Sequence, residues 1–434
     1  MSNIVAIVGR PNVGKSTLFN RLIERREAIE DSTAGTTRDR HYGKAEWNGH
    51  HFSVIDTGGY VQGSDDVFEA EIRKQVALAV EEADAILFLV DTQHGITSMD
   101  EAVAGMLRKS HKPVLLVANK VDTNDKQADA AEFYALGLGE VHCISAQSGA
   151  GTGDLLDEVV KGFQKPTEEV VDDLPKIAIV GKPNVGKSSL VNTLLGKEQS
   201  IVTPIAGTTR DPINTRFNAF GFDVTLLDTA GIRKKQKVDE NIEFYSVLRS
   251  VRAIEDSDVC LLLIDAQEGV GHQDLHIYSM IERNGKGVVV VVNKWDLIEK
   301  DTHTAKAYEA QVRERLAPFN DVPVIFTSVA EKQRIHKAME LALKVYANRK
   351  QRIPTRQLND TMLAEIERMP PPMYKGKSVH IKYVTQLPGV VPAFAFFTNL
   401  PQYVKDSYVR FLENKLRQHY DFNGVPVRVF FRKK

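Results

Sequence analysis

The chain has 434 residues but only two cysteines, and it contains no long hydrophobic run. Cys143 and Cys260 lie in apolar segments without a C-x-x-C pair or a histidine at metal-ligand spacing, so we expect plain buried thiols rather than metal ligands. The longest apolar runs, such as 288–292, are of strand length and far short of a membrane span. No secretory signal is recognised, because residues 3–8 lead directly into a glycine loop. These absences favour a cytoplasmic protein without a membrane anchor.

Charge is nearly balanced over the whole chain, with a net value of -1, but it is unevenly distributed. Residues 352–434 contain 14 Lys and Arg against 6 Asp and Glu, so this segment carries +8 and the rest carries -9. The asymmetry marks the C-terminal segment as the candidate for binding an anionic partner. The length suits two or three domains.

Four short motifs occur twice in the same order. GRPNVGKS at 9–16 matches GKPNVGKS at 181–188, an offset of 172 residues. A-G-T-T-R-D begins at residues 34 and 206, and D-T-x-G begins at 56 and 228, again at 172. N-K-x-D begins at 119 and 293, an offset of 174. Four motifs at nearly one offset predict a duplicated domain.

Each copy alternates short apolar runs with helical patterns such as 67–82 and 241–255. Strands apolar on both faces and separated by helices predict an α/β fold, with a doubly wound, mostly parallel sheet in each copy. The expected strands of the first copy are 4–8, 52–55, 85–90, 114–118 and 141–144. Those of the second copy are 177–180, 224–227, 259–264, 288–292 and 324–327.

The C-terminal segment follows a different pattern. It predicts a helix near 355–368, strands near 378–385 and 393–398, a helix near 403–419 and a strand at 426–431, which together make a small α+β domain. An acidic stretch bounded by prolines separates the two copies and is interpreted as a flexible linker. The predicted organisation is 1–165 for the first copy, 166–175 for the linker, 176–350 for the second copy and 351–434 for the C-terminal domain.

The G-x-x-x-x-G-K-S motif between a strand and a helix is typical of a phosphate-binding loop. Its backbone N–H groups cradle the β-phosphate, and the helix N-terminus adds positive charge. Lys15 and Lys187 are expected to reach the β- and γ-phosphates, and Ser16 and Ser188 to ligate Mg²⁺. Nucleotide contacts are expected from Gly9, Arg10, Pro11, Asn12, Val13, Gly14, Lys15 and Ser16, and from Gly181, Lys182, Pro183, Asn184, Val185, Gly186, Lys187 and Ser188.

The D-T-x-G motif follows an apolar strand, at the sheet edge where open α/β sheets bind ligands. A carboxylate there can hold Mg²⁺ through water, and the motif's last glycine can sense a γ-phosphate through its N–H. The two segments, each with its following residue, are expected to contact the nucleotide: Asp56, Thr57, Gly58, Gly59 and Tyr60, and Asp228, Thr229, Ala230, Gly231 and Ile232.

The N-K-x-D motif selects the base. An aspartate can accept hydrogen bonds from guanine N1–H and N2–H₂, whereas adenine offers no such donor pair, and a site built around such an acceptor penalises the wrong base. The two aspartates take that role, the asparagines brace the pocket, and the lysine stems cover the base. The residues are Asn119, Lys120, Val121 and Asp122 in the first copy, and Asn293, Lys294, Trp295 and Asp296 in the second.

With these motifs in tandem, the chain resembles the bacterial Der (EngA) family, which has two tandem P-loop GTPase domains followed by a KH-like domain. The two x-P-N-V-G-K-S loops, the two A-G-T-T-R-D switches and the length of the C-terminal segment carry the resemblance. It implies binding of GTP and GDP, hydrolysis of GTP to GDP and phosphate, and a role in assembly or stability of the large ribosomal subunit. It also places a fifth guanine motif on Ser145 and Ala146, and on Ser328 and Val329 in place of the expected Ser-Ala.

Hydrolysis is expected to be slow without stimulation. Ras-like GTPases orient the attacking water with a glutamine after D-x-x-G, where this chain has Tyr60 and Ile232. Related GTPases with Asn in the phosphate loop use a bound K⁺, so the resemblance makes Asn12 and Asn184 candidate K⁺ ligands; alternatively, each is a turn residue. The resemblance also implies that Thr37 and Thr209 bind Mg²⁺ when GTP is present, and with Lys15 and Lys187 they form the predicted catalytic set.

Two basic features near the switches have alternative interpretations. Arg38 and Arg210 could act as arginine fingers, but each is followed by an aspartate, so a structural ion pair is as good an explanation. The run 233–237, R-K-K-Q-K, is either a solvated mobile switch or a contact to rRNA phosphates or to the neighbouring domain in one nucleotide state.

The C-terminal segment matches the KH-like element order but lacks the G-x-x-G loop with which KH domains clamp nucleic acid. Phe394, Phe396 and Phe397 are either stacking platforms or core residues. The basic balance favours rRNA or a GTPase domain of the same chain as the partner.

Two functions remain open for a chain expected to be monomeric. One is a GTPase whose nucleotide state rearranges its domains and sets its affinity for the large ribosomal subunit. The other is a GTP-switched protein-interaction module that does not act on the ribosome. Decay of one copy into a structural domain has little support, because both copies keep the Lys, Ser, Asp and N-K-x-D residues.

Overall fold

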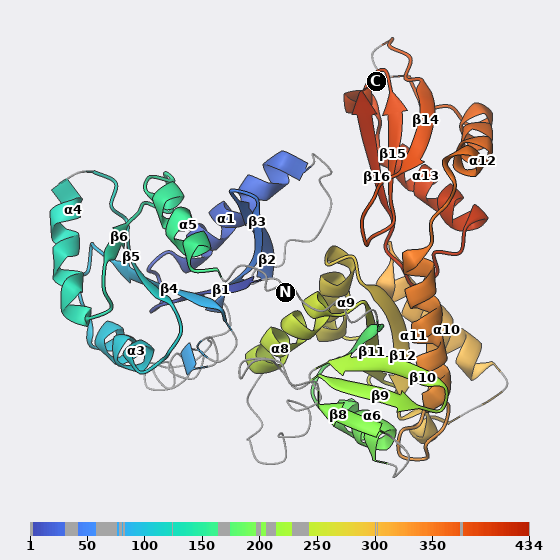
Figure 1. Ribbon diagram of the computed structural model, residues 1–434, viewed down its shortest axis with the longest axis horizontal. Helices are drawn as coiled ribbons and strands as arrows, with labels where there is room; N and C mark the ends of the chain where they lie inside the picture. Colours follow the sequence, from blue (N-terminus) through green and yellow to red (C-terminus); the bar gives the residue numbers. More distant parts are fainter. Residues whose placement is uncertain are drawn as a thin grey trace. The chain divides into compact units, whose positions relative to one another are not determined.

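The computed structural model describes residues 3–30, 42–57, 76–77, 80, 83–123, 125–163, 174–196, 201–204, 214–227, 243–299, 301, 303–373 and 376–433. Contacts divide the chain into two compact units, Met1–Val171 and Asp172–Lys434. The first unit holds the first motif copy, and the second holds the second copy together with the C-terminal segment (Figure 1).

The first unit is built on a six-stranded sheet in the order β2-β3-β1-β4-β5-β6. All neighbouring strands are parallel except β2 and β3, which form an antiparallel hairpin. The strands are β1 (Asn3–Val8), β2 (Tyr42–Trp47), β3 (His50–Asp56), β4 (Ala85–Asp91), β5 (Val114–Asn119) and β6 (Val141–Cys143). The helices are α1 (Lys15–Glu30), α3 (Ser98–Arg108), α4 (Asp125–Asp129), η2 (Ala130–Leu136) and α5 (Thr152–Lys161).

The second unit repeats this topology in a seven-stranded sheet, in the order β13-β12-β11-β7-β10-β9-β8. Strand β8 lies at the antiparallel margin and has no counterpart among the described residues of the first unit. The strands are β7 (Lys176–Val180), β8 (Ile201–Pro204), β9 (Thr215–Ala219), β10 (Phe222–Leu227), β11 (Val259–Asp265), β12 (Gly287–Asn293) and β13 (Val324–Phe326). The helices are α6 (Lys187–Leu195), α8 (Glu243–Asp256), α9 (His272–Arg283), η4 (Trp295–Leu297), α10 (Thr304–Leu316) and α11 (Ile335–Lys350).

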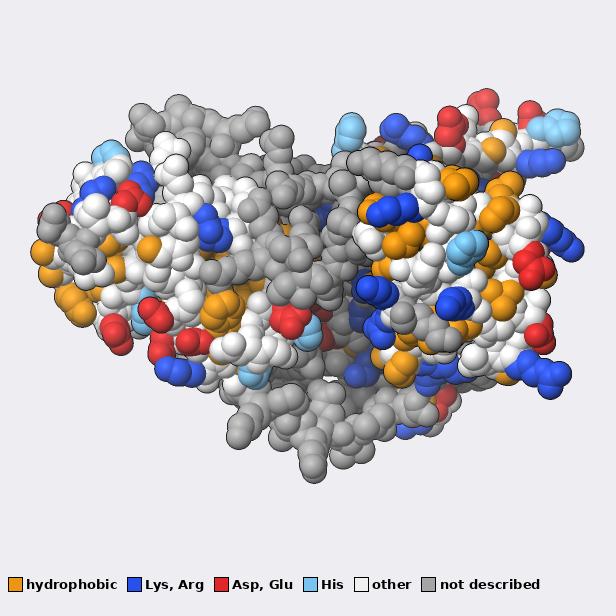
Figure 2. Space-filling view, turned by 90° about the horizontal axis from the view of Figure 1, so that it is seen from above, with side chains coloured by type: hydrophobic (Ala, Val, Ile, Leu, Met, Phe, Trp, Pro, Cys, Tyr) orange, Lys and Arg blue, Asp and Glu red, His pale blue; other side chains and the backbone are white. Residues whose placement is uncertain are grey.

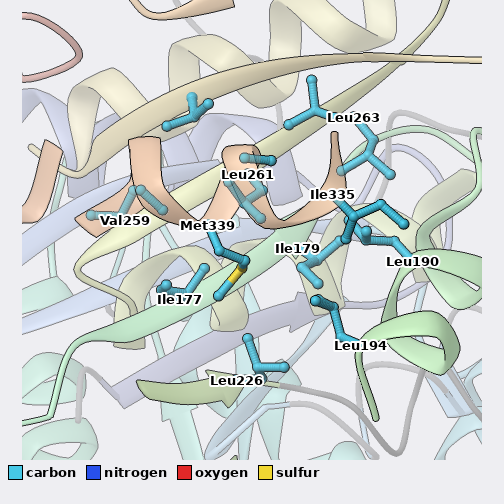
Figure 3. Packing of buried hydrophobic residues seen from close by; sticks show 14 of the residues in the cluster. Ile177, Ile179, Leu190, Leu194, Leu226, Val259, Leu261, Leu263, Ile335 and Met339 are labelled. Atoms are coloured by element: carbon cyan, nitrogen blue, oxygen red, sulfur yellow. The ribbon is translucent and has the colours of Figure 1, made fainter. Parts of the chain in front are cut away.

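Strands β4, β11 and β12 are buried at every position, because helices cover both faces of each sheet. In the second unit, Ile177 and Leu261 of the sheet pack against Met339 of α11 (Figure 3). The uninterrupted apolar runs in the sequence therefore correspond to central strands, and the predicted doubly wound, mostly parallel fold is confirmed for both copies.

The C-terminal segment forms a three-stranded sheet, β14-β15-β16, with the predicted element order. Strands β14 and β15 are antiparallel, while β15 and β16 are parallel. The elements are α12 (Thr355–Arg368), β14 (Ile381–Gln386), β15 (Ala393–Thr398), η5 (Pro401–Tyr403), α13 (Asp406–His419) and β16 (Arg428–Lys433). The predicted α+β domain is confirmed.

Two of these strands begin later than predicted, for identifiable reasons. Before β14, the Asn399 side chain takes the place of strand pairing: its Oδ1 accepts from the His380 N–H at 2.8 Å, and its Nδ2 donates to the Ser378 carbonyl at 3.0 Å. Before β16, Val425 is packed into the core of the second motif copy rather than extended along the sheet.

The sequence analysis missed strands β2, β8 and β9, which lie at the margins of their sheets. In β9, buried residues alternate with exposed ones, such as Arg216, which pairs with Asp223 of β10 at 2.7 Å. A margin strand covered on one face alternates apolar and polar residues, so it lacks the continuous apolar run by which the central strands were recognised.

The C-terminal segment and the second motif copy share packed residues within the second unit. The Val288 N–H donates to the Gly424 carbonyl at 2.8 Å, and the Gly424 N–H donates to the Asp321 carbonyl at 2.8 Å. Arg417 of α13, itself mostly buried, approaches the Asp321 carboxylate at 3.3 Å. Val425 is fully buried in the same core cluster as Val289, so these two parts are held together by core packing and hydrogen bonds.

The two cysteines differ in their environments. Cys260 is fully buried, and burial raises the pKa of its thiol to about 11, whereas Cys143 is half-buried. The prediction of a buried thiol is thus confirmed for Cys260 and only partly for Cys143. Across the stretches that the structure describes, no helix has both the length and the apolar character needed to cross a membrane.

Candidate nucleotide-binding sites

The two phosphate loops connect β1 to α1 and β7 to α6, and their backbones match closely. Asn12 and Asn184 adopt φ angles of 64° and 63°, and Gly14 and Gly186 adopt 97° and 102°. A Cβ on Gly14 would lie 2.2 Å from Asn119 Nδ2, so this position needs glycine both for its backbone angle and for space. Asparagine tolerates the left-handed region, so the turn interpretation of Asn12 and Asn184 agrees with their geometry.

The loop lysines fold back onto their own loops. Lys15 Nζ donates to the Arg10 carbonyl at 2.8 Å, and Lys187 Nζ donates to the carbonyls of Gly181 and Lys182 at 2.6 Å. Burial lowers the pKa of Lys15 to about 8, with Arg10 acting in the same direction and the nearby Asp56 carboxylate opposing both. A buried ammonium that donates to carbonyl groups gains strongly from an anionic phosphate.

Helix α1 and strand β3 meet at a possible magnesium position. Ser16 Oγ donates to Asp56 Oδ2 at 2.5 Å, and Asp56 is fully buried. A hydroxyl and a carboxylate are oxygen ligands of the kind that Mg²⁺ binds, together with phosphates and water. The residues present therefore fit a nucleotide-bound Mg²⁺ in the first copy.

One asparagine in each copy ties the phosphate loop to the fifth-motif loop. Asn119 Nδ2 donates to the Val13 carbonyl at 2.7 Å, and its Oδ1 accepts from the Ala146 N–H at 2.9 Å. In the second copy, Asn293 makes the corresponding bonds to the Val185 carbonyl at 2.8 Å and from the Val329 N–H at 3.1 Å. Each asparagine thus holds the fifth-motif loop beside the phosphate loop.

The aspartates expected to recognise guanine differ between the copies. Asp122 Oδ1 accepts a hydrogen bond from Ser145 Oγ at 2.6 Å. Asp296 Oδ1 is buried and has no hydrogen-bond partner. A buried acceptor left without a donor costs about 1–3 kcal/mol, which a ligand carrying N–H donors would recover. Asp296 thus fits the N1–H and N2–H₂ edge of guanine.

Two buried aspartates that the sequence analysis did not identify hold the N-K-x-D lysines. Lys120 Nζ lies 2.7 Å from Asp91 Oδ2, and Lys294 Nζ lies 2.6 Å from Asp265 Oδ2. The adjacent strands place these aspartates beside Asn119 and Asn293, respectively. The signal in the sequence is a further repeat, D-x-Q-x-G at 91–95 and 265–269, at the same 174-residue offset as N-K-x-D.

Asp91 and Asp265 are also hydrogen-bonded from neighbouring groups. Burial alone would raise the pKa of Asp91, but hydrogen bonds from Lys120, the Gln93 N–H and His94 outweigh it and lower that pKa. Burial likewise opposes the bonds from Lys294 and the Gln267 N–H at Asp265, whose pKa is also lowered. Both carboxylates are therefore held as anions.

The second residue of each phosphate loop forms ion pairs with a different set of acids. Arg10 lies 3.3 Å from Asp100 of α3 and 3.9 Å from Asp91. Lys182 lies 2.5 Å from Glu268 and 3.6 Å from Asp274 of α9. Each pairing links the phosphate loop to the helix that follows β4 or β11.

The x position of N-K-x-D also differs. Val121 is buried, whereas Trp295 packs its ring against Phe326 and Tyr308, with ring centroids 4.2 and 5.3 Å apart. The second copy thus has a tryptophan next in sequence to Asp296, the aspartate expected to recognise guanine.

Several predicted site residues and alternatives lie outside the described residues. They are Thr37, Thr209, Gly58, Gly59, Tyr60, Asp228, Thr229, Ala230, Gly231 and Ile232, with Arg38, Arg210 and the run 233–237. The predicted linker also lies outside them, except for Leu174 and Pro175.

The C-terminal aromatic residues divide between the two faces of their sheet. Phe394 and Phe396 are fully buried in the core against the helices, which confirms the core interpretation for these two. Phe397 is half-buried and stacks on Tyr383, with ring centroids 4.3 Å apart and 13° between planes.

Comparison with known proteins gives full-length similarity. The model of a family described as 50S ribosome-binding GTPase matches residues 4–120 and 176–294, and one described as the KH-domain-like C-terminal domain of EngA bacterial GTPase enzymes matches 352–432. The chain is 62% identical over 434 residues to GTPase Der of Christiangramia forsetii. It is 61% identical over 437 residues to GTPase Der of Flavobacterium psychrophilum, and in both comparisons the match covers 100% of each chain.

Proposed function

This chain belongs to the Der family of GTPases with two G domains, and on that premise we propose that both G domains bind and hydrolyse GTP and that nucleotide state controls action on the large ribosomal subunit during its assembly. The chain is thus an enzyme converting GTP to GDP and phosphate. Its two sites, its ribosomal partner, its monomeric state and its place in the cytoplasm belong to the proposal.

The observation that carries the two-site proposal is the asparagine bridge found in both copies. Asn119 and Asn293 each join a phosphate loop to a base loop through one donated and one accepted bond. A copy that had decayed into a structural domain would have no need to keep the two halves of a nucleotide site in register. The intact bridge in each copy therefore supports nucleotide binding by both.

We assign the roles within each site from chemistry. Lys15 and Lys187 neutralise phosphate charge from the loop centre, and Asp122 and Asp296 select guanine. Asp91 and Asp265 act as positioning residues, because they fix the lysines whose stems lie along the base. Ser16 and Ser188, with Thr37 and Thr209, would hold Mg²⁺, which neutralises charge on the phosphates when bound.

Turnover is proposed to depend on K⁺ held by Asn12 and Asn184. Both asparagines are exposed on the loops, with side chains available to solvent. Their left-handed backbone makes Asn12→Gly a sharp test, because glycine keeps the φ angle while removing the amide. We expect KCl to accelerate the wild type over NaCl at matched ionic strength, and this difference to shrink in the variant while GDP affinity is unchanged. Equal wild-type rates in both salts would remove K⁺ from the proposal.

Single Lys15→Ala and Lys187→Ala variants test the two-site proposal. Each should retain one GDP-binding site and part of the GTPase activity, and the double variant should lose both. Wild-type hydrolysis in either single variant would show that domain to be silent.

The ribosomal part of the proposal is tested separately. Large subunits are sedimented with the protein in GDP and in a non-hydrolysable GTP analogue, at two salt concentrations. Nucleotide-dependent, salt-sensitive co-sedimentation is expected. Nucleotide-dependent capture of another protein without any binding to the subunit would favour the interaction-module alternative instead.

A further inference from the structure

The C-terminal domain separates its charges between its two layers. Strands β14, β15 and β16 contain no Asp or Glu, and neither does the whole stretch 368–405. Five of the six acidic residues in 352–434 lie in α12 and α13. The sixth, Asp421, lies 3.1 Å from Lys344 of the second G domain. The sheet layer is therefore purely basic, and the helical layer carries the carboxylates.

The helices cover one face of this sheet. Val384, Phe394 and Phe396 are fully buried in the same cluster as Leu358 of α12 and Leu412 of α13. Side chains alternate between the faces of a strand, so residues one position along point to the opposite face. Tyr383, Phe397 and Phe430 point to this opposite, open face, and all three are half-buried.

Aromatic and cationic groups are neighbours on this open face. Tyr383 and Phe397 are cross-strand partners and stack with ring centroids 4.3 Å apart. Phe397 pairs in register with Arg432, and Ala393 with Arg428, so both exposed arginines share the face with the ring pair. Arg428 Nη2 donates to the Arg283 carbonyl at 3.1 Å, whereas Arg432 lies directly beside Phe397. Figure 2 shows Lys and Arg side chains interspersed with hydrophobic ones on the second unit.

We propose that this open sheet face binds single-stranded RNA, with bases stacking on Tyr383, Phe397 and Phe430 and phosphates meeting Arg432. Sheets that carry aromatic residues bind unpaired bases in this way, and stacking tolerates any sequence. The proposal deepens the ribosomal function proposed above and rests on it for the source of the RNA. The helical layer is the unfavourable side for RNA, because its carboxylates would face the phosphate backbone.

The proposal is tested with the full chain and a fluorescently labelled 12-nucleotide oligouridylate, by anisotropy at two salt concentrations. Phe397→Leu keeps an apolar side chain but removes the ring, and we expect affinity to fall by about five- to a hundredfold. Arg432→Gln should weaken binding and lower the salt slope by about 0.7. The matched control is Arg410→Gln, which removes the same charge from an exposed position on α13 and should stay within about twofold of wild type.

Wild-type affinity in Phe397→Leu would overturn the proposal, and so would equal losses in Arg410→Gln and Arg432→Gln. Thermal unfolding of the Phe397→Leu variant reports whether it is folded, and Arg432→Gln, at an exposed strand position, tests the face without altering packing. If the wild type does not bind the oligonucleotide and the variants nevertheless lose the large subunit, the face contacts protein and the RNA proposal fails. If the wild type binds the oligonucleotide through this face but not the subunit, the ribosomal function fails and the RNA site stands.

Discussion

The two G domains have nearly the same phosphate loop but different surroundings for the base. Loop φ angles agree within a few degrees at Asn12 and Asn184, and both asparagine bridges are present. At the base, Asp122 is satisfied by Ser145, whereas Asp296 keeps a buried oxygen without a partner. The phosphate-binding part of each site is thus constrained by backbone geometry. The base-binding part differs between the domains in how far the hydrogen bonding of its aspartate depends on the ligand.

The largest expected effect should be the same in both domains. Gly14→Ala and Gly186→Ala each place a Cβ within 2.3 Å of the bridging asparagine at a positive φ. Strain of about 3 kcal/mol should lower GDP affinity of the altered domain by about a hundredfold. Calorimetry should then report one strong site instead of two.

Gly105→Ala in α3 serves as the control, because the nearest atom outside its own helix backbone lies 3.8 Å from the added Cβ. Two strong sites in Gly14→Ala would contradict the close backbone match, and so would an effect confined to one copy.

A second pair of substitutions should separate the domains. Asp91→Asn removes the charge that meets Lys120, His94 and Arg10, and Asp265→Asn removes the charge that meets Lys294. Breaking a buried ion pair costs about 3 kcal/mol, so faster GDP release is expected in both, with the greater change at Asp91.

Release rates are measured in Lys187→Ala and Lys15→Ala backgrounds, where one site remains. Unchanged catalytic rate with altered release would identify a positioning role. An unchanged release rate in either aspartate variant would remove that role for the domain concerned.

The serines of the fifth motif should show a smaller difference. Ser145→Ala takes away the hydrogen bond to Asp122, worth about 1 kcal/mol, so GDP affinity of the first domain should change by about fivefold. Ser328 Oγ accepts from the Glu331 N–H at 3.1 Å, while Asp296 Oδ1 remains unpaired, so Ser328→Ala should have less effect on the base. GDP affinity is measured by titration in each variant. Equal changes in affinity in Ser145→Ala and Ser328→Ala would show that the two base sites work alike.

The smallest effect concerns acid stability. The folded-state pKa of Asp91 and Asp265 lies below the ordinary value of 3.8, so their stabilisation is complete above 3.8 and is lost as pH falls through the lowered values. Thermal unfolding of the wild type and of Asp91→Asn should therefore converge only below about pH 3.8. Convergence already at pH 5 would contradict the lowered pKa.

Sequence patterns predicted the central strands and the motif positions because these depend on local signals. Continuous apolar runs mark strands buried on both faces, and glycine loops mark phosphate sites. Margin strands such as β9 escaped because they alternate, and Asp91 escaped because its role arises only from pairing with a lysine on the adjacent strand. The location of Val425 is set by packing between distant segments, which no local pattern encodes.

That location has a consequence for how the protein is made. The core of the second G domain includes Val425, and the carbonyl of Gly424 pairs with the first residues of β12. During synthesis, the first unit can complete its core as soon as its own residues have emerged. The second G domain cannot complete its core until the residues around 421–425 have been translated. Until then, an open seam remains beside β12, where those residues will pack. Shortening the chain at residue 350 would leave that seam permanently open, so an isolated second G domain is expected to aggregate more readily than the first.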